Sequence, residues 1–557
     1  MASLRSPARR IAAGVTTTLA ALLVWSALVA PNQLNRLTLG AFIRVPIEGL
    51  VVVALVLVLP AKPRRIVAIA VGVILGLLSV VKILDIGFFY ALDRPFNPIT
   101  DWGNFGPAVG VLRDSIGEAG AVAAVIVTAI LILAMLVFVT LSVRRLTRIT
   151  TRHRTASMRA VTVFGVVWII CAAFGIAIVR GAPIASTTAA GLAYEQVHQV
   201  RDGLEDQKKF ATAAAVDPFR NTPGSDLLTG LRGKDVVIAF VESYGQVAVQ
   251  GTSFSRPIDA ELNAGTSKLS AAGFATKSAF LTSPTFGGIS WLAHSTLQSG
   301  LWINNQQRYN QLVAGDRITL SDAFKRAGWR TVADVASNHS DWGPGTTFYH
   351  YDKIYDDRNV GYLGPSFSYA AEPDQYIMSA FQRLELSKPD HAPVMAEIDL
   401  VSSHTPWAPL PTMVDWNQVG NGSIFANQPG QGQGPGVVWR NSKSVQAAYG
   451  QSIQYSLNTL ISFVQTYNDP NLVLILLGDH QPATIVSGPN ATHNVPITIV
   501  AHDPAVMNQI SSWGWQDGML PSPSAPVWPM DTFRDKFLTA YGPQPLPSAS
   551  ATTPAPH

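Results

Sequence analysis

The sequence contains only one cysteine among its 557 residues, Cys171, so an intramolecular disulfide and a Cys-x-x-Cys metal site are both excluded. Charged residues are also scarce, at 14% of the chain against roughly 25% in an average soluble domain. This shortage points to a membrane protein. The formal net charge of +4 is small for this length and gives no indication of nucleic-acid binding.

Long apolar runs are confined almost entirely to the residues before 180. Five of them approach the ~20 residues needed to cross about 30 Å of hydrocarbon, at 11–30, 45–61, 66–92, 120–142 and 160–179. The first follows three arginines, as in a signal peptide, but it is too long for such a segment and four further runs follow it. A soluble helical bundle would show a polar face, which these runs lack. Residues 1–180 are therefore predicted to form five transmembrane helices.

Basic residues set the predicted orientation of these helices. They cluster between the second and third runs and between the fourth and fifth, at Lys62, Arg64, Arg65, Arg144, Arg145, Arg148, Arg152, Arg154 and Arg159. The positive-inside rule then places the N-terminus in the cytoplasm, and five crossings deliver the chain after residue 180 to the outside. Glu48, Lys82 and Asp85 lie within or at the ends of the runs, where they either serve a function or sit at the level of the lipid headgroups.

The chain changes character after residue 180. Residues 181–216 are predicted to form an amphipathic connector along the membrane surface, and residues 543–557 a disordered tail. Between them, 217–542 alternates helical patterns with short apolar runs, namely DVVIAFV, TKSAFLT, RTVADVA, PVMAEIDLV, NLVLILLGD and VPITIVA. This alternation predicts an α/β domain with a mostly parallel central sheet. Ligands of such sheets bind beyond the carboxyl ends of the strands.

Metal-ligand side chains follow several of these predicted strands. They are Glu242 and Ser243 after the first run, His404 after PVMAEIDLV, Asp479 and His480 after NLVLILLG, and His493 before VPITIVA. An Asp-His pair at a strand end is, by itself, equally compatible with a structural role. Together with Glu242 and a hydroxyl group, the pair forms a three-ligand site with one exchangeable position, which suits catalytic Zn²⁺ or Mn²⁺.

The segment LTSPTFGGISWLAHSTLQSG at 281–300 places two glycines shortly before Ser290. These glycines either form an ordinary turn before a short helix or bend the backbone so that the serine hydroxyl points into a pocket. The order of Glu242, Gly-Gly-x-Ser, His-Thr-Pro and Gly-Asp-His resembles the alkaline phosphatase/sulfatase superfamily. It is most similar to the membrane-anchored phosphoglycerol transferases of the lipoteichoic acid synthase type. The resemblance covers residues 230–500, and the five helices before them match the architecture of that family.

The resemblance assigns roles to individual residues. It implies that Ser290, ten residues before Gly300, is the catalytic nucleophile. It implies one divalent metal, with Mn²⁺ as first choice and Zn²⁺ or Mg²⁺ also compatible, bound by Glu242, Ser290, Asp479 and His480. It implies that substrate is contacted by His404, His493 and His294.

The implied reaction is a two-step transfer of a phosphoglycerol-type headgroup. Ser290 attacks the phosphodiester of a phospholipid donor, and the headgroup then passes to a cell-envelope glycan or polymer. The protein is expected in a bacterial-type cell membrane as a multi-pass enzyme with an extracytoplasmic catalytic domain, close to its lipid donors. A single cysteine argues against the related phosphoethanolamine transferases, whose outer domains usually carry several disulfides.

Departures from the family pattern keep alternatives open. The sequence SWLAH at 290–294 lacks the proline and arginine needed for formylglycine formation in sulfatases, and His294 replaces an acidic residue of the transferases. His294 is therefore either a substrate contact or a helix-packing residue. The main alternative function is a phosphodiesterase or sulfatase-type hydrolase that uses water as acceptor. The remaining alternatives are an inactive receptor or scaffold with the same fold and a transporter built on the five helices.

Overall fold

The computed structural model describes residues 7–179, 182–367, 369, 371–388 and 390–542, so the tail expected at 543–557 lies outside the described residues. The chain falls into two compact units, one of Met1–Tyr90 with Arg94–Glu205 and the other of Ala91–Asp93 with Asp206–His557. The helix α6 (Thr188–Ala215) lies within the predicted connector and contributes to both units.

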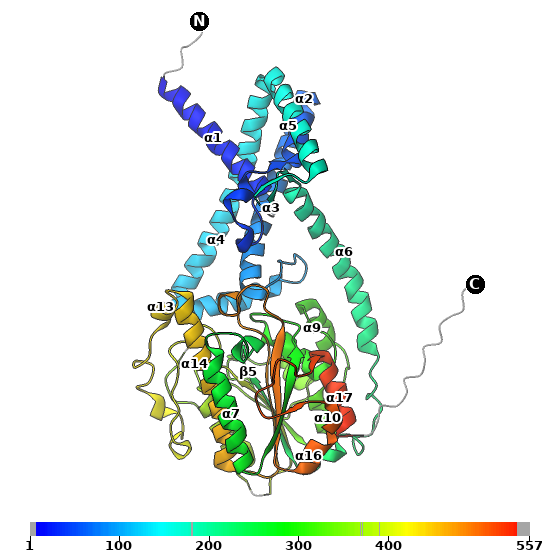
Figure 1. Ribbon diagram of the computed structural model, residues 1–557, viewed down its shortest axis with the longest axis vertical. Helices are drawn as coiled ribbons and strands as arrows, with labels where there is room; N and C mark the ends of the chain where they lie inside the picture. Colours follow the sequence, from blue (N-terminus) through cyan, green and yellow to red (C-terminus); the bar gives the residue numbers. More distant parts are fainter. Residues whose placement is uncertain (1–6, 180–181, 368, 370, 389, 543–557) are drawn as a thin grey trace, which may run out of the picture. The chain divides into compact units, whose positions relative to one another are not determined.

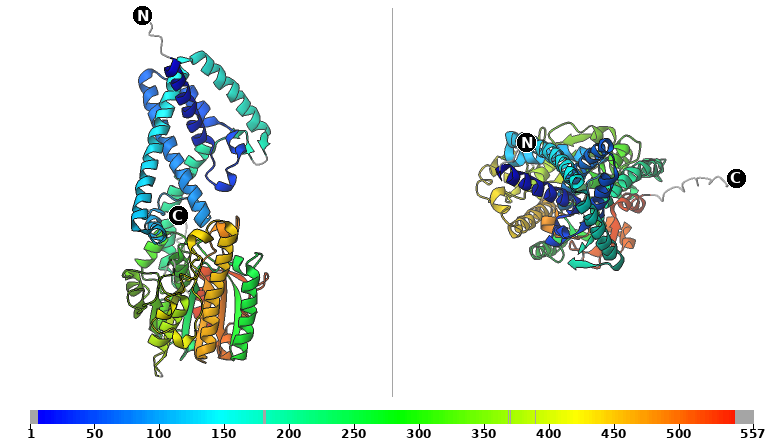
Figure 2. Two further views of the ribbon diagram at one scale, coloured as in Figure 1. Left: turned by 90° about the vertical axis from the view of Figure 1, so that its left-hand side faces the viewer. Right: turned by 90° about the horizontal axis from the view of Figure 1, so that it is seen from above.

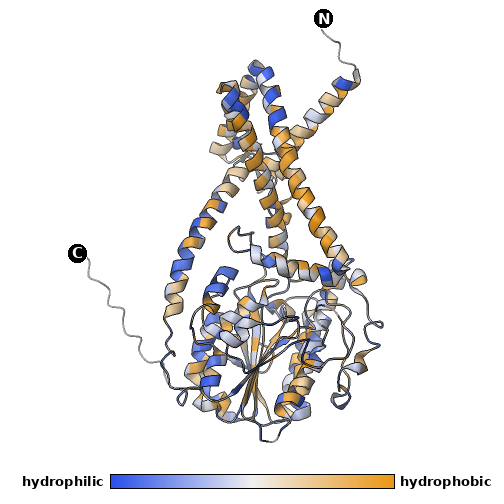
Figure 3. Ribbon diagram, turned by 180° about the vertical axis from the view of Figure 1, so that it is seen from behind, coloured by the Kyte–Doolittle hydropathy of each residue, from blue (hydrophilic) through white to orange (hydrophobic). Residues whose placement is uncertain are grey.

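The first unit is helical. Its main helices are α1 (Pro7–Val29), α2 (Ile47–Val58), α3 (Ala61–Leu92), α4 (Phe105–Arg152) and α5 (Arg154–Phe174), and short strands lie at β1 (Val45–Pro46), β2 (Ala177–Val179), β3 (Ala182–Pro183) and β4 (Ala185–Ser186). Among the described residues, four segments are long and apolar enough to cross a membrane, namely Ile11–Val29, Ala61–Leu92, Ile116–Arg152 and Arg154–Phe174. Apolar residues cover much of these long helices, as the orange ribbons in Figure 3 show.

The second predicted transmembrane span, at 45–61, forms a shorter helix than expected. α2 has 12 residues, and at 1.5 Å per residue it rises about 18 Å, well short of a hydrocarbon layer of about 30 Å. Pro46 occupies its N-cap and Pro60 follows its last turn, so the apolar run of the sequence is longer than the helix that it forms. The count of five crossings, and the orientation derived from it, therefore stay predictions.

The charged residues of the apolar runs have backbone partners. Lys82 Nζ donates to the carbonyl oxygen of Ala27 at 2.8 Å. Asp85 accepts a hydrogen bond from the backbone N–H of Phe96 at 2.9 Å, and Glu48 accepts one from a backbone N–H of α6. These contacts favour a structural role, because each charge satisfies a backbone group at a helix end or in a loop.

The second unit is built around a nine-stranded sheet with the order β12-β6-β11-β10-β5-β9-β7-β8, in which β13 also pairs with β6. The strands are β5 (Asp235–Val241), β6 (Ala275–Thr282), β7 (Arg330–Asp334), β8 (Lys353–Tyr355), β9 (Val394–Leu400), β10 (Leu472–Gly478), β11 (Asn494–Ala501), β12 (Gln516–Asp517) and β13 (Val527–Pro529). From β10 to β8 the neighbouring strands are parallel, as predicted. β11 is antiparallel to β10, because the loop 479–493 re-enters the sheet at the edge where β10 leaves it.

Helices cover both faces of this sheet. Val237, Ala239 and Val241 of β5 face a core shared with α7 (Ser255–Ala271), α12 (Asp374–Phe381) and α14 (Ser442–Tyr467). The residues between them face a second core with α8 (Ser290–Ser299), α10 (Leu320–Arg326), α16 (Pro504–Gln509) and α17 (Phe533–Ala540). Figure 1 and the left view of Figure 2 both show α7 and α14 side by side against the sheet. Shorter helices are α9 (Gln306–Val313), α11 (Gly343–Thr347), α13 (Pro435–Val438) and α15 (Thr484–Ser487).

Candidate metal and nucleophile site

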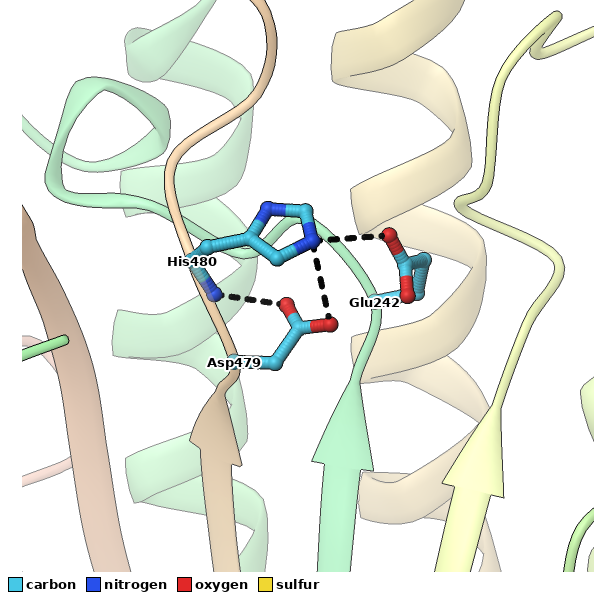
Figure 4. A group of neighbouring side chains, drawn as sticks. All are labelled: Glu242, Asp479 and His480. Atoms are coloured by element: carbon cyan, nitrogen blue, oxygen red, sulfur yellow. Dashed lines mark hydrogen bonds and ion pairs between the residues drawn. The ribbon is translucent and has the colours of Figure 1, made fainter. Parts of the chain in front are cut away.

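Two neighbouring parallel strands deliver the central side chains of the site. β5 and β10 pair in a register that sets Val241 beside Gly478, so the next residue of each strand, Glu242 and Asp479, emerges at the same edge. Gly478 allows the turn that follows β5 to pack against the end of β10, because a Cβ atom there would lie 1.9 Å from the carbonyl oxygen of Tyr244. Figure 4 shows the two carboxylates at the strand ends with the imidazole of His480 facing both.

The distances within this group leave one carboxylate oxygen without a hydrogen bond. His480 Nε2 lies 3.4 Å from Glu242 Oε1 and 3.4 Å from Asp479 Oδ2. Asp479 Oδ1 accepts hydrogen bonds from the backbone N–H groups of Ser243 at 2.8 Å and His480 at 2.7 Å. Asp479 Oδ2 is buried and makes no hydrogen bond. A buried carboxylate oxygen that faces an imidazole nitrogen and a second carboxylate fits a bound divalent cation.

Ser290 joins this group from the first position of α8. Its hydroxyl donates to Glu242 Oε2 at 2.9 Å and lies 3.2 Å from His480 Nε2. The preceding residue, Ile289, has φ of +67°, a left-handed conformation that is unusual for a β-branched side chain. Gly287 and Gly288 also have positive φ, so the whole turn before the helix is held in conformations that glycine adopts most readily. This strained turn directs the Ser290 hydroxyl toward the strand ends.

Burial and mutual charge shift the pKa of each group. Burial raises the pKa of the Glu242 carboxyl, but the neighbouring His480 outweighs this effect and holds the pKa well below its ordinary value. Burial and the charge of Glu242 raise the pKa of Asp479 to about 7. Burial lowers the pKa of His480, but the two carboxylates raise it to about 9. The cluster therefore attracts positive charge strongly, and a divalent ion would satisfy it in place of a proton.

The other histidines expected at the site occupy different places. His404 follows β9, its ring stacks on Tyr369 with centroids 3.6 Å apart, and its charge contributes to the lowered pKa of Glu242. The ring of His493 lies 5.2 Å from that of Phe286, beside the turn that leads to Ser290. His404 therefore lies after the end of β9 and His493 beside the turn before Ser290, and neither belongs to the group of Glu242, Asp479 and His480.

His294 belongs to a second group, two of whose members the sequence analysis missed. Its Nδ1 lies 3.2 Å from Glu397 and 3.4 Å from Asp399, and its ring stacks on Phe240 at 3.7 Å. Burial and the charges of Glu397 and Asp479 raise the pKa of Asp399 to about 7, against the lowering effect of His294. The available signal was the pattern AEIDL, in which two acids share one face of a strand that is otherwise apolar.

No protein-family model matches the sequence, and no curated protein matches it. Similar solved structures include the lipoteichoic acid synthase LtaP from Listeria monocytogenes, with 13% identity over 60% of this chain and 78% of that one and a TM-score of 0.37. A protein in the alkaline phosphatase superfamily from Vibrio parahaemolyticus has 15% identity over 54% and 69%, with a TM-score of 0.35. The periplasmic domain of EptC from Escherichia coli in complex with Zn has 13% identity over 56% and 82%, with a TM-score of 0.37. The superfamily that the motifs resemble recurs here, but at this distance the likeness assigns no reaction to this chain.

Proposed function

We propose that this protein is a membrane-anchored, metal-dependent transferase in which Ser290 accepts a phosphoglycerol-type headgroup from a phospholipid and passes it to a cell-envelope glycan or polymer. The observation that carries the proposal is the placement of the Ser290 hydroxyl within hydrogen-bonding distance of both Glu242 and His480. A free serine hydroxyl is a weak nucleophile and needs such activation. The four long apolar helices support a membrane anchor, with the catalytic domain proposed to lie outside the cytoplasm.

One divalent ion, Mn²⁺ by preference or else Zn²⁺ or Mg²⁺, would be held by Glu242, Ser290, Asp479 and His480. Such an ion lowers the pKa of a bound hydroxyl and offsets the negative charge of phosphate oxygens. The residues of the chain supply the rest of the chemistry. Glu242 accepts the hydrogen bond of the Ser290 hydroxyl and so orients its oxygen. The backbone N–H groups at the start of α8 face a phosphate bound there.

The first step breaks the bond between phosphorus and the lipid oxygen as Ser290 Oγ bonds to phosphorus. The proton of the serine leaves toward Glu242, and the lipid alkoxide takes a proton from His404 or His493, the two imidazoles placed near the turn and strand ends. In the second step a hydroxyl of the acceptor attacks the same phosphorus and gives its proton to the imidazole that protonated the lipid, while the bond between phosphorus and Ser290 Oγ breaks and Ser290 takes its proton back from Glu242. Water in place of the acceptor would give the alternative reaction, hydrolysis. Labelled lipid separates the two, because a labelled glycan or polymer appears only on transfer.

Substitution of Ser290 tests the proposal. The full chain is incubated with phosphatidylglycerol in detergent, and intact mass and peptide mapping locate a phosphoglycerol adduct. Ser290→Ala is expected to abolish turnover and the adduct, whereas Ser290→Thr should keep some activity because the hydroxyl remains. Thr282→Val is the matched control, since Thr282 carries a nearby hydroxyl that bonds Asn494 instead. An adduct on Thr285, or undiminished transfer by Ser290→Ala, would overturn the assignment.

A further inference from the structure

A second group of metal-ligand side chains lies close to the first, and no step of the proposed reaction uses it. It consists of His294, Glu397 and Asp399, whose ligand atoms all lie within 4.8 Å of one another. Glu397 is buried, and His294 and Asp399 are 14% and 19% exposed in their side chains. Outside the group around Asp479, this is the only such cluster among the described residues.

Three elements of the fold bring the group together. Glu397 and Asp399 are alternate residues of β9 and so project from the same face of the sheet. β9 pairs with β5 in a register that sets Phe240 beside Asp399. The ring of His294, from α8, stacks on Phe240 and thereby turns its Nδ1 toward the two carboxylates. The group is therefore built on rigid elements, which suits a binding site.

The distances fit ligands around an ion better than a direct ion pair. A charge-assisted hydrogen bond between an imidazolium and a carboxylate is about 2.7–2.9 Å long, whereas His294 Nδ1 is 3.2 Å from Glu397 Oε1 and 3.4 Å from Asp399 Oδ1. Ligand bonds of about 2.0–2.2 Å, arranged tetrahedrally or octahedrally, separate ligand atoms by about 2.8–3.6 Å. The separations in the group around Asp479 fall in the same range, from 2.9 to 3.4 Å.

One oxygen of the group has no other partner. Asp399 Oδ1 is buried and makes no hydrogen bond, as is also true of Asp479 Oδ2 in the first group. Glu397, in contrast, uses its second oxygen, Oε2, to accept hydrogen bonds from Gln298 and from the hydroxyl of Tyr351. This leaves its Oε1 to face His294. Each carboxylate thus directs one oxygen toward the imidazole, as ligands with a fixed outer shell do.

The charge of the two groups is also sufficient to balance more than one cation. Together they contain four carboxylates and two imidazoles. A single divalent ion offsets half of the four negative charges, whereas two divalent ions offset all of them while both imidazoles stay neutral, the form in which histidine binds metals. Buried carboxylates left without compensation would be costly.

We propose that His294, Glu397 and Asp399 bind a second divalent cation, of the Mn²⁺ or Zn²⁺ class, one helical turn from Ser290. The inference does not depend on which headgroup or acceptor the protein uses. His294 lies four residues after Ser290 on α8, a rise of about 6 Å, so the two ions would hold the same helix at successive turns.

Metal stoichiometry tests the proposal without any activity measurement. The full-length protein in detergent is dialysed against low micromolar Mn²⁺, and its metal content is measured by mass spectrometry. We expect two equivalents per chain in the wild type and one in Asp399→Asn or His294→Gln. Asp479→Asn should also retain one, and the double variant Asp399→Asn/Asp479→Asn none. Asp341→Asn is the matched control, because Asp341 is 96% exposed and should leave both ions bound.

The outcomes separate this inference from the proposed function. One equivalent in the wild type, lost in Asp479→Asn and kept in Asp399→Asn, overturns the second site and leaves the first intact. One equivalent lost in Asp399→Asn and kept in Asp479→Asn supports the second site and removes the first. Two equivalents in the wild type support two occupied sites, and one equivalent excludes them, even if a variant fails to fold, which circular dichroism would reveal.

Discussion

Gly478→Ala should disable the site without removing any of its side chains. Gly478 is the last residue of β10, directly before Asp479, and a Cβ there would meet the backbone oxygen of Tyr244 at 1.9 Å. Because real Cβ contacts below 3.0 Å essentially never occur, the end of β10 and the turn that follows Glu242 must separate by at least 1.1 Å, the difference between 3.0 and 1.9 Å. A backbone carbonyl cannot rotate away as a side chain can.

That displacement is large compared with what a metal site tolerates. Metal–ligand distances stay within about ±0.2 Å, and a misplacement of about 1 Å costs on the order of 100-fold in rate. We expect Gly478→Ala to lower transfer activity about 100-fold, or about 2.7 kcal/mol in the barrier, and to weaken Mn²⁺ binding.

Metal titration and turnover of the purified full chain measure both effects, with thermal unfolding to report the strain of about 1–3 kcal/mol expected from overpacking. Gly436→Ala is the control, since a Cβ at Gly436 meets no atom within 4 Å. Wild-type metal affinity and turnover in Gly478→Ala would refute the reasoning that the close packing of the turn after β5 on the end of β10 positions the ligands.

Three further predictions concern the metal, the stability of the domain and its location. Asp479→Asn should lower metal content and activity together, and full metal occupancy in that variant would remove Asp479 from the ligand set. Asp217 and Arg534 are both fully buried and lie 3.0 Å apart, so Asp217→Asn should destabilise the domain by about 3–5 kcal/mol in denaturant unfolding at pH 7. Burial raises the pKa of Asp217, but Arg534 outweighs it and the net pKa is lowered, so this stability is present above the ordinary pKa and is lost as the pH falls through the lowered one. An equal loss in Asp217→Asn at pH 7 and at strongly acidic pH would contradict that account. A reporter enzyme that works only outside the cytoplasm should be active when it is fused after Arg220. Activity of a reporter that works only in the cytoplasm, fused at the same place, would contradict the predicted topology.

The strands of the second unit were predictable because buried parallel strands are continuous apolar runs. All six runs form strands of the sheet, from β5 to β11. The ends of two of these runs are also visible in the sequence, because each run is followed by a charged residue, Glu242 in one case and Asp479 in the other. A parallel sheet gathers the carboxyl ends of its strands at one edge, so the sequence alone was enough to expect these two residues side by side.

Other features depend on information that a linear pattern does not carry. The second apolar run was long enough for a span, but Pro46 and Pro60 limit the helix within it to 12 residues. The antiparallel direction of β11 depends on where its loop re-enters the sheet. Glu397 and Asp399 were read as part of an apolar strand, because the periodicity of a strand gives the shared face of two residues but not the helix that packs on it.

The helix α8 explains why Ser290 and Gly300 are ten residues apart in the sequence. α8 contains ten residues, begins at Ser290 after a left-handed turn, and ends where Gly300 adopts φ of +64° and donates to the carbonyl oxygen of Thr296 at 3.0 Å. A Cβ at Gly300 would lie 2.9 Å from Arg534 Nε, so the end of α8 is fixed against α17. The helix is thus held at both ends by conformations that few residues other than glycine adopt. A change in its length would rotate Ser290 away from Glu242 by about 100° per residue and move His294 off the face of Phe240 at the same time. Both groups of metal-ligand residues therefore depend on the length of one short helix.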